Sequence, residues 1–386
     1  MKIASMKGVD ERIGNFLIRL LSFFKSSKSK QYPENPKNVL FIKFWGIGSL
    51  LLAEPSISKF KEKFPDCKIY ILTLAQNKEL EKLLPNVEKF FTIKLGDFDE
   101  FFFSSTLAWK KLRKIKFDIV FDLEFFANFS TIFGFLLKKQ VLKGFTHGQK
   151  VIKESLLDFS IIFDEQMHTS LNFLKLVVSE NETKVEKLKT QHKKFPQENL
   201  FKIQEVLKNF EFGKKFVVVN PNASQLAFER RWDFRNFAEL INKITFLNDY
   251  GVILIGSQNE TNYVKMIQNL CNSKEQVLNL AGKLELLDLA VLLSRAEILV
   301  TNDSGPMHLG VTVGTKIVGL FGPETPLRYS PLGEKKSVVY KNLECSPCMS
   351  VNNSKTVNCI YDSPKCMESI EVSEVFREVT KFFSKS

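Results

Sequence analysis

The sequence predicts an α/β protein with two Rossmann-like parallel-sheet domains that face a cleft. Two observations carry this prediction. Short apolar runs alternate with turns and helical segments in both halves of the chain, and a polar stretch poor in strand signals separates the two series. The length of 386 residues agrees, because one hydrophobic core seldom organises more than about 250 to 300 residues.

The first series begins after an N-terminal segment, at Asn38. An apolar strand at residues 39–42 leads through the glycine turn Gly46–Ser49 into a helix at 50–64, with Pro55 near the first turn of that helix. Further strands are expected at 68–72 and 118–122, and a further helix near 78–84. Repetition of strand, turn and helix indicates a parallel sheet covered on both faces.

The second series begins near residue 214. Strands are expected at 216–220, 252–256, 298–300 and 317–321, and helices at 232–246, 260–271, 284–294 and after residue 304. We therefore divide the chain into an N-terminal amphipathic helix (1–35), a first Rossmann-like domain (36–185), a linker (186–213), a second Rossmann-like domain (214–344) and a Cys-rich segment with a C-terminal helix (345–386).

Charge and hydropathy narrow the class of protein. The net charge of +12 favours an anionic partner. The Lys residues are dispersed, without the basic and aromatic stripes of a nucleic-acid-binding protein, so we expect no nucleic-acid partner. No apolar run reaches the ~18 residues of a membrane span, and no secretion signal is recognisable, which favours a cytoplasmic protein.

The N-terminal segment, residues 9–30, has the spacing of an amphipathic helix. Apolar residues recur every three or four positions from Ile13 to Phe24, and Lys25, Lys28 and Lys30 follow. Such a helix could lie on an anionic membrane surface or pack against the protein itself. The sequence leaves both alternatives open.

The strongest local signal for chemistry is the segment Asp303–His308, between a strand and a helix. Ser304 suits an N-cap, Gly305 allows a ligand to approach the backbone, and Pro306 suits the first helical position. Free N–H groups at a helix start favour a phosphate. His308 could donate to the same phosphate, and Asp303 could accept hydrogen bonds from sugar hydroxyls. The alternative is a capped helix with an incidental histidine.

A second candidate site lies at an earlier strand end. The small-residue loop 220–224 contains Asn222 and Ser224, and Arg230 and Arg231 precede the expected helix at Trp232. Guanidinium groups at the edge of a cleft bind diphosphate oxygens through bidentate, charge-assisted bonds. Two solvated arginines beside a packing tryptophan are the alternative.

These segments together resemble a known family. The runs Asn302–Leu309 and Gly319–Pro323, the loop 220–224 and Arg231-Trp232 closely resemble the family 9 glycosyltransferases, the bacterial lipopolysaccharide heptosyltransferases. The resemblance runs from Asn38 to about Phe376. It implies the GT-B fold, with the first domain binding an acceptor and the second a nucleotide-sugar donor.

The implied reaction is an inverting, metal-independent transfer of heptose, or a related sugar, from an ADP-heptose-like donor to a lipid-linked saccharide of the lipopolysaccharide core. From the net positive charge and the N-terminal helix we expect a cytoplasmic protein that could be peripheral on the inner face of the inner membrane. The donor-binding positions fall on Asn222, Ser224, Arg230, Arg231, Gln258, Asp303, Ser304, Gly305 and His308, with Glu260 as an alternative to Gln258 at the ribose. Gly48 and His147 are the candidate acceptor-binding residues.

One position departs from the family pattern. The glycine turn of the first domain usually carries an Asp that is proposed as general base, and here that position is Ser49. A neutral Ser cannot take the acceptor proton at pH 7. Glu124, just past a strand end, is the best candidate to replace it, and Asp122 and Glu54 are weaker candidates. A buried Glu124 with no role in the chemistry and an unusually acidic acceptor that needs no such base are alternatives. The second hypothesis for the whole protein is a catalytically impaired chain that binds nucleotide-sugars without transfer. The third is another GT-B reaction, such as epimerisation.

Four of the six cysteines lie in the C-terminal segment, in the pattern Cys345-x2-Cys348-x10-Cys359-x6-Cys366. Four thiolates at this spacing could build a structural zinc site. Free or redox-variable thiols and disulfides are the alternatives. We expect no cofactor in catalysis itself.

Overall fold

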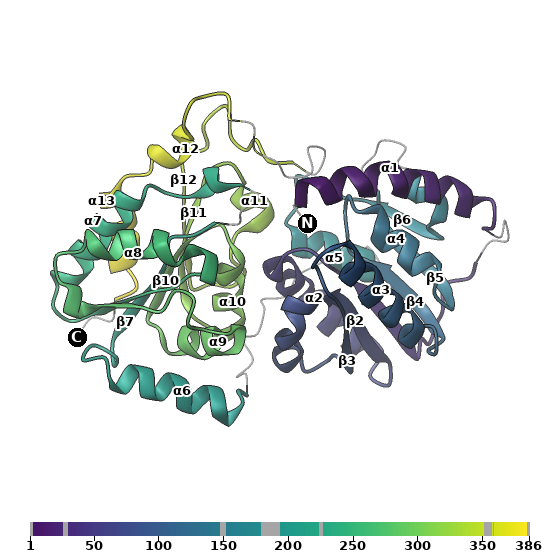
Figure 1. Cartoon of the computed structure of the whole chain (residues 1–386), viewed down its shortest axis with the longest axis horizontal. Coiled ribbons are helices and arrows are strands. Elements are labelled where there is room, and N and C mark those ends of the chain that lie inside the picture. Colours follow the sequence, from purple (N-terminus) through teal and green to yellow (C-terminus); the bar gives the residue numbers. More distant parts are fainter. Residues whose placement is uncertain are drawn as a thin grey trace. The chain divides into compact units, whose positions relative to one another are not determined.

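The chain forms two compact α/β units in the computed structural model, residues Met1–Glu186 and Lys187–Ser386 (Figure 1). The structure describes residues 3–25, 30–146, 152–178, 194–223, 227–350, 357 and 359–383. Each unit contains one six-stranded parallel sheet. The prediction of two Rossmann-like halves is confirmed.

The elements of unit 1 follow one another as strand and helix. The helices are α1 (Ile3–Ser22), α2 (Ile47–Lys63), α3 (Phe98–Leu112), α4 (Asn128–Phe135) and α5 (Thr169–Val177), with the 3-10 segments η1 (Ala75–Leu83) and η2 (Ile152–Leu156). The strands are β1 (Asn38–Ile42), β2 (Lys68–Leu74), β3 (Lys89–Ile93), β4 (Phe117–Asp122), β5 (Lys139–Thr146) and β6 (Phe159–Ile162).

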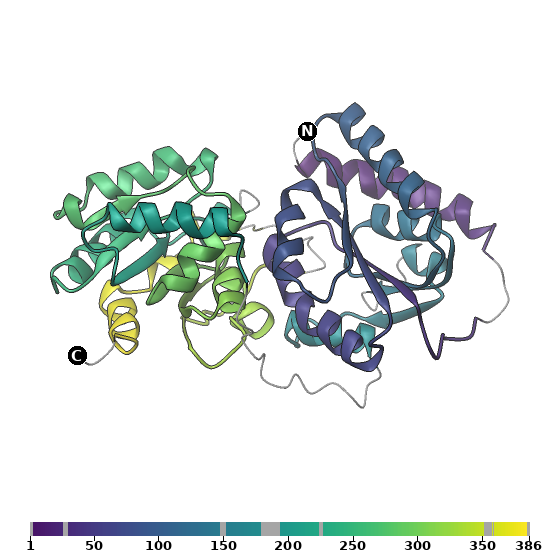
Figure 2. The same ribbon diagram turned by 90° about the horizontal axis from the view of Figure 1, so that it is seen from below.

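The sheet of unit 1 has the order β3-β2-β1-β4-β5-β6 and carries helices on both faces (Figure 2). Because side chains alternate along a strand, Leu40 and Ile42 of β1 pack with α3 and α4, whereas Phe41 packs on Phe60 of α2. Helix α1 lies outside α4 and packs against it through Ile18, which is fully buried with Ile132 and Leu156. Strand β1 is buried within this sheet, and its carboxyl end leads into the turn before Ser49.

Unit 2 repeats the plan. Its helices are α6 (Gln197–Lys208), α7 (Phe234–Thr245), α8 (Thr261–Asn269), α9 (Leu286–Arg295), α10 (Gly305–Val313), α11 (Pro326–Tyr329), α12 (Lys365–Glu368) and α13 (Val372–Thr380), with 3-10 segments η4 (Phe228–Arg230), η5 (Gln258–Glu260) and η6 (Lys274–Gln276). Its strands are β7 (Phe216–Asn220), β8 (Gly251–Leu254), β9 (Val277–Asn279), β10 (Ile298–Asn302), β11 (Lys316–Phe321) and β12 (Lys336–Tyr340).

The sheet of unit 2 has the order β12-β11-β10-β7-β8-β9. Strands β7 and β10 are neighbours at its centre, and all five residues of each are buried. Their neighbouring carboxyl ends mark the point where the strand order reverses, which is where ligands bind in open α/β sheets. The C-terminal helix α13 closes the core from one side through Val375 and Val379.

Several element boundaries differ from the sequence prediction. Helix α2 begins at Ile47, three residues early, so Pro55 lies in its interior and leaves the carbonyl of Leu51 without a helical N–H partner. Helix α1 ends at Ser22 and does not continue to residue 30. Helix α7 begins at Phe234, after Asp233, whose side chain accepts a hydrogen bond from the N–H of Arg235.

The segment predicted as a helix near residues 78–84 is the 3-10 segment η1. Among the described residues, no helix is both long and apolar enough to cross a membrane.

Candidate functional site

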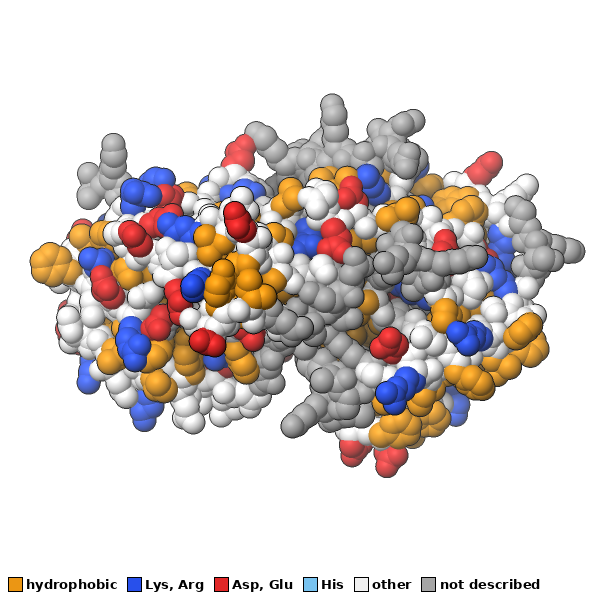
Figure 3. Space-filling view, turned by 90° about the horizontal axis from the view of Figure 1, so that it is seen from above, with side chains coloured by type: hydrophobic (Ala, Val, Ile, Leu, Met, Phe, Trp, Pro, Cys, Tyr) orange, Lys and Arg blue, Asp and Glu red, His pale blue; other side chains and the backbone are white. Residues whose placement is uncertain are grey.

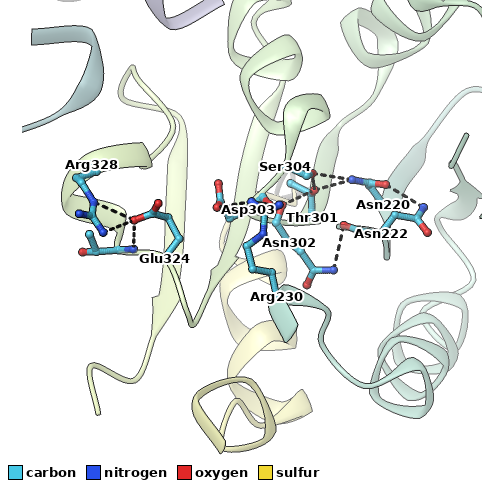
Figure 4. Close-up of polar contacts among 10 residues, drawn as sticks. Asn220, Asn222, Arg230, Thr301, Asn302, Asp303, Ser304, Glu324 and Arg328 are labelled. Atoms are coloured by element: carbon cyan, nitrogen blue, oxygen red, sulfur yellow. Dashed lines mark hydrogen bonds and ion pairs between the residues drawn. The ribbon is translucent and has the colours of Figure 1, made fainter. Parts of the chain in front are cut away.

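The candidate donor site of unit 2 is built at the carboxyl ends of β7 and β10. These strands pair in parallel, with Asn220 opposite Thr301. The Asn220 amide donates to the hydroxyl of Thr301 at 3.0 Å and to that of Ser304 at 2.9 Å (Figure 4). The end of one strand therefore fixes the turn that follows the other.

A second pair of amides joins the loops around this turn. The Asn302 amide donates to the carbonyls of Pro221 (3.0 Å) and Asn222 (3.3 Å), while its oxygen accepts from the Trp232 N–H at 3.2 Å. The Asn222 amide donates to the Ile255 carbonyl after β8 at 2.9 Å. Both side chains are buried, so three loops are held together by bonds shielded from water. The Asn222 Oδ1 atom is buried and has no partner among the described residues.

Helix α10 starts at this turn with its first N–H groups uncapped by a side chain. Ser304 is the N-cap residue, as expected, but its hydroxyl makes no capping bond; it is occupied by Asn220 and Thr301 instead. Ser304, Gly305 and Pro306 are partly exposed, whereas His308, one turn further, is only 5% exposed. Pro306 has no N–H and the Met307 N–H donates to the Ser304 carbonyl at 3.2 Å, so the helix start presents its positive dipole and the Gly305 N–H to an anion.

Arg230 reaches the same turn from η4. Its Nη1 lies 3.0 Å from Asp303 Oδ2 and 3.1 Å from the Asp303 carbonyl oxygen. Both side chains are largely buried, and the Arg230 Nε has no hydrogen-bond partner among the described residues. That Nε is itself buried, so it is the charge of the guanidinium beside a helix start that is suited to a diphosphate.

The other predicted donor residues of unit 2 lie at neighbouring loops. Arg231 is packed between the rings of Phe228 and Tyr263, with its guanidinium carbon 4.5 Å and 4.4 Å from their centres, and pairs with Glu260 at 3.4 Å. Burial raises the pKa of Tyr263 to about 12. Glu260 also closes a capping box with Ser257. Arg231 and Glu260 thus have structural partners already.

Gln258 is exposed and lies against Gly282. A Cβ atom added at position 282 would lie 2.5 Å from the Oε1 atom of Gln258. Gly282 has a φ of +74° and donates its N–H to the Gly256 carbonyl at 2.8 Å. The loops after β8 and β9 are therefore in contact at Gln258, and a side chain at position 282 would push this residue away.

A buried ion pair that the sequence did not indicate lies after β11. Arg328 and Glu324 approach to 2.7 Å with 5% and 2% side-chain exposure, and Arg328 also donates to the Met349 carbonyl (Figure 4). This pair links the loop after β11 to the Cys-rich segment. The only sequence signal was their i,i+4 spacing, which is common on solvated helices.

In unit 1, the turn predicted at Gly46–Ser49 lies at the carboxyl end of β1. Gly46 has a φ of +80°, in the left-handed region that favours glycine, and precedes the first residue of α2. Gly48 and Ser49 are in the first turn of the helix, with Gly48 buried and Ser49 partly exposed. The position that carries Asp in the family is thus at a helix start, at the edge where ligands bind.

Glu124, the candidate base, is fully buried and has three partners. Its Oε1 accepts from the N–H groups of Phe44 (2.7 Å) and Trp45 (3.0 Å), and its Oε2 lies 2.9 Å from Lys43 Nζ. Lys43 itself is 2% exposed. The carboxylate is bonded to the backbone of the turn between β1 and α2 on its buried side. It cannot reach an acceptor hydroxyl unless that turn moves.

The weaker candidates are engaged as well. Asp122 is fully buried, accepts from the Thr131 hydroxyl and the Glu124 N–H, and has its pKa raised by burial. Glu54 accepts from Ser58 at 2.8 Å within α2. Lys153, which sequence reasoning missed, is fully buried and donates to the Glu124 carbonyl at 2.7 Å. A buried charged cluster therefore lies beneath the turn that follows β1.

The proposed zinc site is not supported by the structure. Among the described residues, no group of three or more His, Cys, Asp or Glu side chains is placed to hold a metal ion. All four C-terminal cysteines are free thiols: Cys366 is buried, Cys345 and Cys348 are partly exposed, and Cys359 is exposed. Burial, and secondarily the neighbouring cysteines, raise the pKa of Cys366 to about 11 and also raise that of Cys348, which favours the neutral thiols.

The remaining cysteines and predicted site residues are either buried or outside the described part of the chain, or lie together in unit 2. Cys67 and Cys271 are buried. Ser224 and His147, predicted to contact donor and acceptor, lie outside the described residues. The site residues brought together are therefore Asn222, Arg230, Asp303, Ser304 and Gly305, all within one unit.

Known proteins are similar to this chain in sequence and in fold. A family model, glycosyltransferase family 9 (heptosyltransferase), matches residues 106–357. The lipooligosaccharide heptosyltransferase 2 of Campylobacter jejuni is 27% identical over 349 residues, covering 88% of this chain and 96% of the relative.

Two solved structures have a similar fold. A family 9 glycosyltransferase from Veillonella parvula gives a TM-score of 0.75 at 18% identity, covering 93% of this chain and all of that one. The Escherichia coli ADP-heptose lipopolysaccharide heptosyltransferase II gives 0.70 at 17% identity, covering 90% of this chain and 98% of the other.

Two six-stranded parallel-sheet units, with these solved structures as neighbours, define the GT-B fold, as predicted. The family match covers well over half of the chain. The chain belongs to glycosyltransferase family 9, and the resemblance seen in its sequence is confirmed.

Proposed function

We propose that this chain transfers a heptose, or a related sugar, from ADP-heptose or a similar nucleotide-diphosphate donor to a lipid-linked saccharide of the lipopolysaccharide core. The single observation that carries the proposal is the arrangement of Arg230 and Asp303 at the open start of α10. The names of its relatives support the sugar and the nucleotide: one is a lipooligosaccharide heptosyltransferase and another an ADP-heptose heptosyltransferase.

The donor diphosphate would bind at the start of α10. The Gly305 N–H, the helix dipole and the guanidinium of Arg230 would together neutralise the charge that develops on the leaving ADP. Asp303 is held by Arg230 and directs its other carboxylate oxygen to the sugar hydroxyls. On this account the leaving group needs no metal ion, and an acceptor attacking from the opposite side of the sugar inverts the anomeric carbon.

The acceptor side is proposed with a different role for Glu124 than the sequence suggested. Its carboxylate fixes the backbone of Phe44 and Trp45, and so fixes the helix start that carries Gly48 and Ser49. Glu124 is then a positioning residue, acting through the turn. If the turn opens on acceptor binding, the same carboxylate becomes available as the base, which is the sequence-based hypothesis.

A second candidate function is a nucleotide-sugar-binding protein that does not transfer the sugar. The observation that favours it is the neutral Ser49 at the family's base position, combined with the burial of Glu124.

The proposed location is the cytoplasm, at the inner face of the inner membrane, where a lipid-linked acceptor and an anionic membrane surface are both available.

Donor binding tests the first step of the proposal. Thermal shift with ADP-, GDP- and UDP-sugars should show selective stabilisation by the ADP donor, of about 2.7 kcal/mol at 100 times its dissociation constant. Arg230→Gln should weaken ADP binding by roughly tenfold to a hundredfold, because a charge-assisted bond contributes about 1.5 to 3 kcal/mol.

The matched control is Arg235→Gln. Arg235 is on the neighbouring helix α7, its side chain is 74% exposed, and it pairs only loosely with Asp233 at 3.9 Å. Its replacement should leave ADP binding unchanged. Equal ADP affinity of wild type and Arg230→Gln would remove Arg230 from the donor site.

A further inference from the structure

Helix α1 precedes the first strand of unit 1 and exposes a row of large apolar side chains. Val9, Ile13, Phe16 and Leu20 follow one another at spacings of four, three and four residues, which places them on one side of the helix, and Phe23 and Phe24 follow in the turn after its last residue, Ser22. The exposed fractions of these six apolar residues are, in chain order, 43%, 55%, 66%, 47%, 85% and 75%. We call these six residues the α1 row.

The exposure of the α1 row does not come from a loosely attached helix. Ile18 is fully buried, and Leu17 and Leu21 pack beside it on Ile132 and Leu156. The Asp10 carboxylate accepts hydrogen bonds from the N–H groups of Asn128 and Phe129, both at 2.8 Å, and so caps α4. One side of α1 is therefore fixed to unit 1 while the α1 row remains uncovered.

Two of the basic residues that follow the helix contact unit 1, and the third, Lys28, lies outside the described residues. Lys25 donates to the Leu157 carbonyl at 2.5 Å, and Lys30 pairs with Asp158 at 3.0 Å. These contacts tie the end of α1 to unit 1. Among the described residues of this segment, the exposed charges beside the α1 row are on the helix itself.

Arg12 and Arg19 are exposed and each precedes a residue of the α1 row. They lie about 100° around the helix from Ile13 and Leu20, so their long side chains can extend alongside the row. Glu11, the exposed acid of the helix, is two residues before Ile13 and so lies on the far side of the helix from it. An apolar row flanked by cations is the pattern of a helix that lies in the plane of an anionic bilayer.

The same layer of unit 1 exposes further aromatic residues. Helices α3 and α4 contact each other through Phe101 and Phe129, and α4 carries α1. On α3, Phe98, Phe102 and Phe103 are each more than 60% exposed. Figure 3 views the side on which α1 lies, and hydrophobic side chains gather there in a band on the right-hand unit, with Lys and Arg side chains beside it.

We propose that the α1 row inserts into the headgroup region of a membrane that contains anionic lipid, with Arg12 and Arg19 on the phosphates. The occupant is a lipid surface and not a second protein, because the row is flanked by cations on a chain of net charge +12, which repels its own copies. This docking is independent of the transfer reaction and adds to it a fixed orientation of unit 1 at the membrane.

The test is co-sedimentation of the full chain with phosphatidylcholine vesicles, with and without phosphatidylglycerol. The wild type should bind the anionic vesicles and lose binding as salt is raised. Ile13→Gln, Phe16→Gln and Leu20→Gln together should lower the partition coefficient at least about tenfold. Arg12→Gln with Arg19→Gln should lower it severalfold on anionic vesicles only.

The matched control places three Gln residues at equally exposed apolar positions of unit 2. Phe201, Phe246 and Met266 are 62%, 85% and 50% exposed, and their replacement should leave vesicle binding unchanged. Circular dichroism and ADP binding check that every variant folds.

Three outcomes would overturn the proposal. The first is vesicle binding by the α1 variant equal to that of the wild type. The second is the same loss of binding in the control. The third is a wild-type dimer in sedimentation velocity that the α1 variant abolishes, because a second copy of the chain would then cover the row.

Discussion

The buried pair of Lys43 and Glu124 gives the sharpest prediction about unit 1. Glu124→Gln keeps an oxygen for the N–H groups of Phe44 and Trp45 but removes the charge that faces Lys43 at 2.9 Å. Lys43 is 2% exposed and has no route to water in place. The substitution therefore leaves a buried ammonium without its counterion.

Removing one partner of a buried pair costs about 3 to 5 kcal/mol. For a unit of this size, each kcal/mol lowers Tm by about 2 to 4 °C, so the transition of unit 1 should fall by roughly 6 to 20 °C. Differential scanning calorimetry measures it. Glu62→Gln is the control, since Glu62 also pairs with a lysine but is 70% exposed, and its Tm should change by about 2 °C or less.

The double variant Lys43→Met, Glu124→Gln separates the two roles of Glu124. Removing both charges should recover at least about 2 kcal/mol relative to the sum of the single changes. If Glu124 is a positioning residue, transfer activity should return with stability; if it is the base, the stable double variant should stay inactive. A Glu124→Gln chain as stable as the wild type would refute the reasoning from the buried pair.

Two further predictions concern other buried groups. Burial lowers the pKa of Lys143 to about 8, against about 10.4 in the unfolded chain. Between about pH 8 and about pH 10.4 the unfolded chain binds this proton and the folded chain does not, so the free energy of unfolding rises with pH in that window. Lys143→Met should therefore raise Tm at pH 7 and have less effect near pH 10, which calorimetry at both pH values checks. Asn302→Ala removes the bonds to Pro221, Asn222 and Trp232 and should destabilise unit 2 by about 2 to 4 kcal/mol in urea while weakening ADP binding.

The donor side could be predicted from the sequence because its residues are contiguous. The run from Asn302 to His308 contains the strand end, the turn and the helix start, and local geometry alone brings them together. Arg230 was predicted from the same reasoning at a second strand end. Its pairing with Asp303, 73 residues away, follows from the adjacency of β7 and β10 and is not visible in the pattern.

The acceptor side could not be predicted in the same way. Glu124 follows a strand and looks like a residue exposed at the edge of the sheet. Its partners Phe44, Trp45 and Lys43 are about 80 positions earlier, and only the pairing of β1 with β4 brings them to it. A lysine directly after the apolar run 39–42 was the available signal, because a cation at a buried strand end requires a counterion.

The details of capping and helix length also depended on tertiary contacts. Ser304 has the right side chain for a cap, but Asn220 competes for its hydroxyl across the sheet. Pro55 suggested a helix that starts late, whereas packing of α2 on the sheet and on α5 keeps it in the interior of a longer helix. In both places the local preference was read correctly and a distant contact prevailed.

The measurement that tests the central claim most directly is a transfer assay on the intact chain. ADP-heptose is incubated with the protein and a lipid-linked core saccharide in the presence of EDTA, and both ADP release and the mass of the glycolipid are followed. The account predicts stoichiometric ADP and a glycolipid heavier by one heptose, with the rate reduced by Arg230→Gln and unchanged by Arg235→Gln. Tight ADP-heptose binding with no gain in glycolipid mass, over a range of core acceptors, would contradict transfer and leave the chain as a nucleotide-sugar-binding protein.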